Sequence, residues 1–398
     1  MSVSAREFLH TPGPTHIPDR VLNAMHRQPY DLSDPRFLDL ALSCFEDLKG
    51  IFRTEGEVFL YASNGHGGWE AALSTLFEPG DCVLLPDVGH FSQSWGGHAR
   101  AFGLEVLSPL GDRRRALDPQ VVEDALRDDG VGRIKAVLAV QTDTATGITS
   151  DIPAIRAAID AAGHPALLVV DVIASLAAAP FAMDDWGIDV AIGASQKALM
   201  GPPGLAAVAV SRRAAEVAAT RAGPRYYWDW RIRSEREMYR RFCGTAPEHT
   251  LFGLREALDI LAEDGLDAVI ARHARLAAAV QATVAAWASA GALAFNALEP
   301  AERSVSVTTV LMPEGIDGQA FRDYVRDEHG VALGGGLGTM EGGAFRIGHL
   351  GSLNAPMVLG CLATVETALI RKSVPHGEGG LRAAVELLAA DRAPRAGP

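Results

Sequence analysis

The sequence predicts an α/β protein with a large domain, built on a mostly parallel sheet flanked by helices, and a small α+β domain at the C-terminal end. Short β-branched runs alternate with Ala- and Leu-rich helical segments over the first part of the chain. Several of these runs are apolar at consecutive positions, as expected of strands that are covered on both faces. Beyond Thr250 a helical stripe stops at Gly265 and the pattern changes, which predicts the second domain.

The large domain is expected to span residues 21–265. Residues 1–20 form a proline-containing arm ahead of it, and the segment FLDLALSCFEDLKGIF has the periodicity of a helix. Seven strand candidates follow in chain order: GEVFLYAS, GDCVLLPD, LEVLSP, IKAVLAVQ, PALLVVDVI, IDVAIGAS and GLAAVAVS. In such sheets ligands bind at the carboxyl ends of the strands, so the residues at those ends are the candidates for a site.

The small domain, expected over residues 266–398, has helix and strand candidates of its own. Its strand candidates are SVSVTTVLMP and AFRIGHLG. They are interleaved with the helical segments RHARLAAAVQATVAAWA, GQAFRDYVRDEHG and APMVLGCLATVETALIRK. This mixture of short strands and longer helices predicts an α+β unit.

The composition favours a small-molecule ligand. The 398 residues carry a net charge of -13, which argues against a nucleic-acid or anionic-membrane partner, because phosphates attract a basic face. No apolar run approaches the length of a membrane span, and the first residues lack a targeting pattern. The cysteines have no metal-ligand spacing, so we expect no metal site and reduced thiols in a cytoplasmic protein.

Lys197 and Asp171 are the first candidates for chemistry. Lys197 lies in GASQKALMGPPG, which is typical of a rigid turn between two buried strands, and Asp171 follows the apolar run PALLVV. Alone, a lysine in a turn is usually solvated, and an aspartate after a strand usually caps a helix or a turn. Together, at the ends of two successive strands, they match what a pyridoxal-phosphate enzyme requires: an amine for a Schiff base and a carboxylate for the pyridine nitrogen.

Two further segments fit an anionic ligand. SNGHGGWEAAL follows a strand and opens a helix, so the backbone N–H groups of its glycines can approach a phosphate at the helix N-terminus. A dinucleotide fingerprint is a weak alternative, because its third glycine would fall on Glu70, and a plain turn stays open. Arg346, in AFRIGHLG, is either a member of a buried ion pair or a bidentate ligand for a substrate carboxylate.

The order of these motifs resembles the class V aminotransferases of fold type I, and among them the alanine:glyoxylate, serine:glyoxylate and aspartate:glyoxylate branch. The resemblance extends from about Pro12 to about Ala368 and includes TPGPT, SNGHGGWEAAL, TDTATG, VVDVIAS, GASQKALMGPPG, GTAP and GGGLGTMEGGAFRIGHLG. It implies pyridoxal 5'-phosphate as cofactor. It also implies transfer of an amino group from a small amino acid (alanine, serine or aspartate-like) to a 2-oxo acid such as glyoxylate or pyruvate.

The resemblance also implies roles for individual residues. Lys197 would form the Schiff base and move the substrate proton, while Asp171 would hold the pyridine nitrogen. Arg346 would hold the α-carboxylate of the substrate. The other implied cofactor contacts are Gly65, His66 and Gln196 at the phosphate, Phe91 and Ile173 on the two ring faces, and Thr144 near the ring hydroxyl.

A second group of implied residues belongs to an active site shared between subunits. Thr245, in GTAP, would reach the cofactor phosphate of a neighbouring subunit, which implies a homodimer. Phe242 stands where the family usually has a tyrosine, and it cannot supply that residue's hydrogen bond. Glu248 and His249 replace small or apolar residues. They either select a polar side group of the substrate or form hydrogen bonds at the subunit interface.

Rival functions stay open at this level. Fold-type-I relatives include desulfurases, which need a nucleophilic cysteine on a mobile small-domain loop, whereas Cys361 lies within the helical segment MVLGCLATV. A lyase would release ammonia or a carbon fragment without an acceptor. A non-catalytic or nicotinamide-binding α/β protein would be colourless, whereas the pyridoxal-phosphate protein would be yellow until borohydride reduces it.

Overall fold

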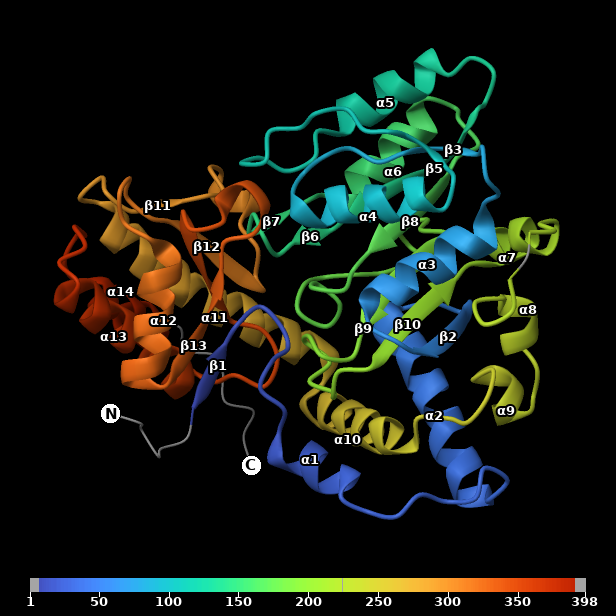
Figure 1. Ribbon diagram of the computed structural model, residues 1–398, viewed down its shortest axis with the longest axis horizontal. Coiled ribbons are helices and arrows are strands. Elements are labelled where there is room, and N and C mark those ends of the chain that lie inside the picture. The colour runs from blue at the N-terminus through green and yellow to red at the C-terminus, as the bar shows by residue number, and fades with distance from the viewer. Residues whose placement is uncertain (1–6, 224, 391–398) are drawn as a thin grey trace.

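The computed structural model describes residues 7–223 and 225–390 and consists of a larger and a smaller part (Figure 1). All seven strand candidates of the larger part form strands, and they join into one sheet of order β2-β10-β9-β8-β5-β3-β4. The strands are β2 (Glu57–Ala62), β3 (Cys82–Leu84), β4 (Glu105–Leu107), β5 (Ile134–Val140), β8 (Leu167–Asp171), β9 (Val190–Ala194) and β10 (Leu205–Val210). A separate hairpin follows β5 and consists of β6 (Thr142–Asp143) and β7 (Ile148–Thr149).

The sheet is mostly parallel, as predicted. Strands β9, β8, β5, β3 and β4 pair in parallel, whereas β10 is antiparallel to both of its neighbours, β9 and β2. Because β2 and β9 are both antiparallel to β10, β2 runs in the same direction as β9, β8 and β5. The carboxyl ends of these four strands therefore meet at one edge of the sheet.

Helices cover both faces of this sheet. A side chain at Gly68 in α3 (Gly65–Leu76) would meet Ile192 of β9, whereas a side chain at Gly193 would meet Phe52 at the end of α2 (Pro35–Phe52). Consecutive strand residues point to opposite faces, so α3 and α2 lie on opposite sides. The other helices of the larger part are α1 (Asp19–Met25), α4 (His90–Ala101), α5 (Pro119–Asp128), α6 (Ile152–Ala161), α7 (Arg212–Ala219), α8 (Trp230–Arg233), α9 (Met238–Arg241) and α10 (Glu248–Asp264).

Local sequence explains where several of these helices begin. The side chain of Asp34 accepts a hydrogen bond from Arg36 N at the start of α2, and Pro35 occupies the first helical position. Asp118 and Pro119 repeat this arrangement at the start of α5. An aspartate cap satisfies an N–H group that the helix itself cannot, and proline lacks the N–H that would be unpaired there.

The smaller part has a five-stranded sheet of order β1-β13-β14-β12-β11. Its strands are β1 (Phe8–His10), β11 (Ala294–Phe295), β12 (Val307–Leu311), β13 (Val331–Gly335) and β14 (Ala344–Gly348). The two strand candidates correspond to β12 and β14, whereas β1, β11 and β13 were not predicted. Strand β1 pairs in parallel with β13, and Figure 1 shows it in blue beside the orange strands of this part. Residues 8–10 of the predicted arm therefore belong to the smaller sheet.

Helices pack on this second sheet and form a core of their own. They are α11 (Leu266–Ala288), α12 (Gly318–His329), α13 (Ala355–Arg371) and α14 (Gly380–Ala390), with short 3₁₀ turns at Pro300–Glu302 and Gly338–Met340. Trp287, Phe345 and Leu362 are fully buried in this core. Helix α11 starts directly after Gly265, earlier than the predicted segment at 272–288. Within residues 7–223 and 225–390, no helix combines the length and the apolarity needed to cross a membrane.

Candidate active site

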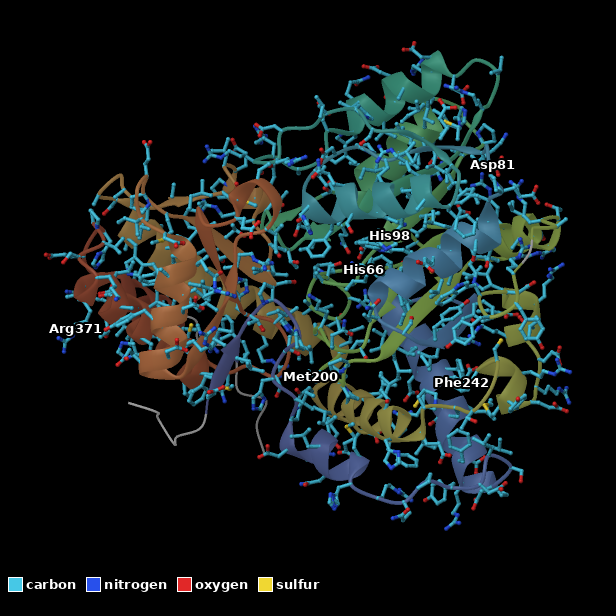
Figure 2. The ribbon with its side chains drawn as sticks, viewed as in Figure 1. His66, Asp81, His98, Met200, Phe242 and Arg371 are labelled. Carbon is cyan, nitrogen blue, oxygen red and sulfur yellow. The ribbon has the colours of Figure 1, made fainter. Side chains whose placement is uncertain are left out.

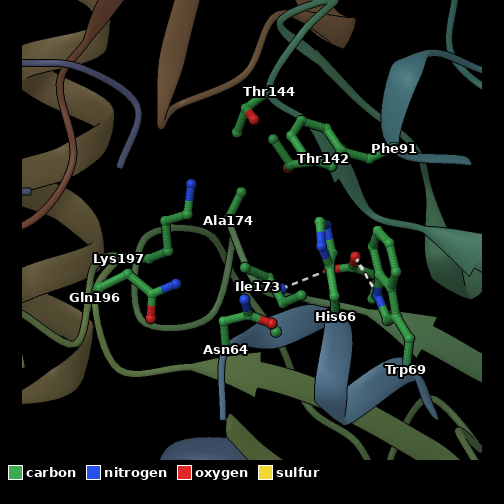
Figure 3. A pocket seen from close by; sticks show the side chains of 12 residues that line it. Asn64, His66, Trp69, Phe91, Thr142, Thr144, Ile173, Ala174, Gln196 and Lys197 are labelled. Atoms are coloured by element: carbon green, nitrogen blue, oxygen red, sulfur yellow. Dashed lines mark hydrogen bonds between the residues drawn. The ribbon is translucent and has the colours of Figure 1, made fainter. Parts of the chain in front are cut away.

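One cavity lies at the sheet edge where the carboxyl ends of β2, β9, β8 and β5 meet. It has a volume of about 200 Å³. Eight of the residues that sequence analysis selected line it: Gly65, His66, Phe91, Thr144, Asp171, Ile173, Gln196 and Lys197. Figure 3 shows Lys197, His66, Phe91 and Thr144 around the same hollow. The structure thus brings together Lys197, Asp171 and the start of the Gly65 helix, which the strand-end rule selected. It brings them to the same cavity as the residues that the resemblance implied; their roles stay predictions.

Lys197 lies in the turn after β9. The turn is closed by hydrogen bonds from Met200 N to Lys197 O (3.0 Å) and from Gly201 N to Ser195 O (2.9 Å). The Lys197 side chain is partly buried, and its Nζ donates a hydrogen bond to Pro12 O at 2.6 Å. Burial, together with the positive charge of Arg346, lowers the pKa of Lys197 to about 8. The amine is thus held in place and loses its proton more easily than an exposed lysine.

Asp171 ends β8 and is buried, with 4% of its surface exposed. Its Oδ1 accepts a hydrogen bond from Ile173 N (2.7 Å), and its Oδ2 accepts one from Trp69 Nε1 (2.9 Å). Burial raises the pKa of Asp171 to about 7, although these two donors act in the opposite direction. A buried carboxylate of this kind is stabilised by a cationic or protonated partner in the cavity.

The N-terminus of α3 forms another wall of the cavity. Asn64 caps the helix and accepts a hydrogen bond from Gly67 N at 3.3 Å. The N–H groups of Gly65 and His66 are among the first of the helix, which have no intrahelical acceptor and favour an anion. A Cβ at Gly65 would fall 3.1 Å from Cγ1 of Ile173, so a larger residue at this position would have to displace the Ile173 side chain. This end of the cavity suits a phosphate.

Gln196 and His66 add polar groups to the same wall. Gln196 Oε1 is buried and has no hydrogen-bond partner within the part of the chain that the structure describes. A buried amide oxygen without a partner is costly, so a bound group that donates a hydrogen bond to Gln196 Oε1 would stabilise this arrangement. The His66 ring lies 5.3 Å from the ring of His98, and Figure 2 shows the two close together at the centre of the molecule. Burial and the neighbouring histidines lower the pKa of His66.

Arg346 approaches the cavity from β14 of the smaller part. It is 7% exposed, and it donates to Gly335 O from Nε (2.6 Å) and to Thr144 O from Nη1 (2.8 Å). Among the residues described by the structure, Nη2 of Arg346 has no hydrogen-bond partner, and no carboxylate lies within ion-pair distance of the guanidinium. Burial lowers the pKa of Arg346 to about 10. This favours the interpretation of Arg346 as a ligand for a carboxylate, which stays a prediction, because the guanidinium has a donor available for an anion.

Four predicted residues lie away from this cavity. Thr245 is exposed, and Phe242, labelled in Figure 2, is buried with its ring centroid 6.0 Å from that of Phe45 in α2. Glu248 Oε2 accepts a hydrogen bond from Tyr30 N (2.7 Å). His249 Nε2 lies 2.8 Å from Arg27 O. Within a single chain, Glu248 and His249 thus connect α10 to the segment between α1 and α2.

Sequence analysis missed several residues of the cavity. Asn64, Trp69, Thr142 and Ala174 also line it. The motif SNGHGGWEAAL contains the first two, and each has a separate local signal: Asn is a preferred helix cap, and a buried indole needs an acceptor. The contact between Pro12 and Lys197 joins residues far apart in the chain, and the sequence offers no local signal for it.

Comparison with known proteins agrees with this geometry. Residues 8–347 match the family described as aminotransferase class-V. The chain is 42% identical over 390 residues to the serine–glyoxylate aminotransferase of Methylorubrum extorquens, with 96% of each chain covered. It is 38% identical over 389 residues to the L-aspartate–glyoxylate aminotransferase of Paracoccus denitrificans, again with 96% of each chain covered.

Solved structures give the same result. The pyridoxamine–pyruvate aminotransferase of Mesorhizobium loti superposes with a TM-score of 0.90 at 28% identity, covering 98% of this chain and 100% of that one. The family match extends over most of the chain, and a relative more than 30% identical covers nearly all of it. The chain therefore belongs to the class V aminotransferases, a family of fold type I pyridoxal-phosphate enzymes.

Proposed function

We propose that this enzyme transfers the amino group of a small amino acid, serine, aspartate or alanine, to glyoxylate or pyruvate, and that the reaction takes place in the cavity around Lys197. The observation that carries the proposal is the position of Lys197 and Asp171, which line one cavity from the ends of adjacent parallel strands. The relatives named for serine, aspartate and glyoxylate support the choice of substrates.

The cavity fits pyridoxal phosphate at both ends. At one end lie the N–H groups at the start of α3, which suit a phosphate, and beside them lies Gln196, whose side-chain amide can donate to a phosphate from Nε2. At the other end lies buried Asp171, whose raised pKa falls when a protonated pyridine nitrogen pairs with it. Phe91 and Ile173 line the cavity between these ends and would enclose the ring. When bound, the cofactor would supply an electron sink that accepts the electrons of the substrate Cα–H bond as the proton leaves.

Lys197 is the amine that we assign to the reaction. The chain has lysines at positions 49, 135, 197 and 372 only. The other three are accounted for elsewhere: Lys49 pairs with Glu46, Lys135 donates to Gly132 O, and Lys372 lies over the Tyr324 ring. With a pKa of about 8, Lys197 Nζ can accept the substrate Cα proton and return it, as a general base and then a general acid.

Arg346 is the residue that we assign to the α-carboxylate of the substrate. Two of its nitrogens are held by backbone carbonyls, and the remaining Nη2 is available. A guanidinium fixed in this way binds a carboxylate with a charge-assisted hydrogen bond and little loss of side-chain freedom. The Thr144 carbonyl that holds Arg346 belongs to a residue of the cavity wall, so carboxylate binding and cofactor binding share one support.

We also propose a homodimer in which Thr245 contributes to the cavity of the other subunit. The support is that Thr245 is exposed and lies away from the cavity of its own chain. Glu248 and His249 would either face the same shared site or form hydrogen bonds at the interface between the subunits. Sedimentation of the holoenzyme at several concentrations tests the dimer, and a monomer with full activity would contradict it.

The function is tested with purified protein and a substrate panel. Added pyridoxal phosphate is expected to give a visible absorbance band that borohydride abolishes, with the reduced label on the peptide that contains Lys197. Serine, aspartate and alanine are then assayed with glyoxylate and with pyruvate. Formation of one molecule of amino-acid product for each molecule of 2-oxo acid consumed supports the proposal. Release of ammonia without an acceptor would identify a lyase, and a colourless protein would exclude both enzymes.

A further inference from the structure

Residues 11–15, which we call the crossing segment, contact both ends of Lys197. Pro12 O accepts the hydrogen bond from Lys197 Nζ at 2.6 Å. Three residues later, Thr15 N donates to Gln196 O (3.1 Å), and Thr15 Oγ1 donates to Lys197 O (3.0 Å). The crossing segment therefore binds the tip of the lysine side chain as well as the backbone of the turn that carries it.

Gly13 leaves room for this contact. Its φ is +141°, a conformation that L side chains rarely adopt. A Cβ at position 13 would lie 2.6 Å from Cε and 2.7 Å from Cδ of Lys197, closer than atoms can approach. Any side chain at this position would push the lysine away from Pro12 O. Because residue 13 is a glycine, the backbone of the crossing segment can lie directly against the Lys197 side chain.

The opposite side of the crossing segment lies against the smaller part. A Cβ at Gly348 in β14 would lie 2.8 Å from Pro12 N, and a Cβ at Gly334 in β13 would lie 2.7 Å from Pro12 Cδ. Gly334 pairs in register with Arg346, and Gly348 follows Arg346 by two residues in the same strand. The crossing segment is thus enclosed between the lysine turn and the two strands around Arg346.

We propose that the crossing segment is a positioning element for Lys197: the Pro12 carbonyl holds Nζ whenever the amine is free, and Thr15 fixes the turn below it. This inference rests on the proposed role of Lys197 as the reacting amine. A lysine side chain has four rotatable bonds, and a fixed acceptor confines the amine to one place in the cavity. Because the segment also packs against β13 and β14, it links the position of the amine to the strand that carries Arg346.

The test measures how fast Lys197 reacts in the apoprotein. Pyridoxal phosphate is mixed with apoprotein, the visible band is followed in time, and samples are quenched with borohydride for peptide mass spectrometry. Gly13→Ala displaces Nζ from Pro12 O, so its labelling of Lys197 is expected to slow by roughly 10- to 100-fold. Thr15→Val removes the bond to Lys197 O and is expected to slow labelling in the same direction. Thr15→Ser keeps the hydroxyl and is expected to restore the rate.

Gly80→Ala is the matched control. Gly80 is exposed and also has a positive φ (+94°), but no atom of residues 7–223 and 225–390, apart from its chain neighbours, would lie within 4 Å of a Cβ at this position. This variant carries the backbone strain without a contact to Lys197 and is expected to label at the wild-type rate. The melting temperature of each apoprotein is measured alongside. Slow labelling in a variant that melts like Gly80→Ala indicates positioning, because a merely structural role would not change the rate alone.

Each outcome decides between the two proposals. If Gly13→Ala and Thr15→Val label Lys197 at the wild-type rate, the crossing segment is only a connection and the inference is wrong, while the proposed function stands. If the wild-type protein is labelled at another lysine or not at all, the proposed function itself fails. If Gly13→Ala does not fold, the comparison of Thr15→Val with Thr15→Ser decides alone, and equal rates for those two variants overturn the inference.

Discussion

Trp69→Phe is expected to weaken cofactor binding, because it removes a donor to the buried carboxylate of Asp171. Trp69 Nε1 donates to Asp171 Oδ2 at 2.9 Å, and both side chains are at most 4% exposed. A hydrogen bond to a charged group is worth about 1.5–3 kcal/mol. The bond also exists in the protein without cofactor, so this energy sets the maximum effect: since each 1.4 kcal/mol is a factor of ten, the Kd of the phosphorylated cofactor is expected to rise by up to about 150-fold. Titration calorimetry of apoprotein with pyridoxamine 5'-phosphate, which forms no covalent bond to Lys197, measures this Kd.

Trp95→Phe provides the matched control for this measurement. Trp95 is fully buried and stacks on Trp69 with ring centroids 5.6 Å apart, but its Nε1 has no hydrogen-bond partner among the residues that the structure describes. The two substitutions remove the same indole volume from neighbouring positions, so both create a similar packing defect. Only Trp69→Phe removes a bond to Asp171. If both variants raise the Kd equally, the effect comes from packing, and the role of Trp69 in supporting Asp171 is refuted.

Three further predictions concern the other groups of the site. The native pKa of Lys197, about 8, lies below its ordinary 10.5, so between these pH values the unfolded chain holds a proton that the native chain has lost. Lys197 therefore contributes a rise of the unfolding free energy with pH, whereas Cys44 and Cys361, whose pKa burial raises, contribute a fall. Between urea titrations at pH 8 and 10.5, the change in unfolding free energy should be more positive in the wild type than in Lys197→Met, and equal changes would contradict the lowered pKa of Lys197. Arg346→Ala should weaken binding of carboxylate substrates by about 2–5 kcal/mol, as measured by kcat/KM across the amino-acid panel, and unchanged values for every amino acid would make Arg346 structural. Glu248→Val combined with His249→Ile should change the ratios of kcat/KM between serine, aspartate and alanine; a change in dimer stability alone would assign the pair to the interface.

Several strands of the larger part were predictable because they are nearly continuous apolar runs. Strands such as β8 and β9 are buried on both faces, so every residue contributes to the signal. The same argument placed Asp171 and Lys197 together, because parallel strands deliver their carboxyl ends to one edge. The N-terminal strand β1 gave no such signal: it has three residues, and its partner β13 contains glycines and lies over 300 residues later in the chain.

The surroundings of Arg346 were harder to predict than those of Asp171, because they depend on contacts between the two parts of the chain. Arg346 was selected as a lone guanidinium on an apolar strand, but its supports, the carbonyls of Thr144 and Gly335, come from opposite parts. Backbone carbonyls carry no side-chain signature, so no pattern of residue types reports them. The same holds for Pro12, whose carbonyl, rather than its ring, meets Lys197. A sequence therefore predicts which side chains carry the chemistry better than it predicts the backbone atoms that hold them in place.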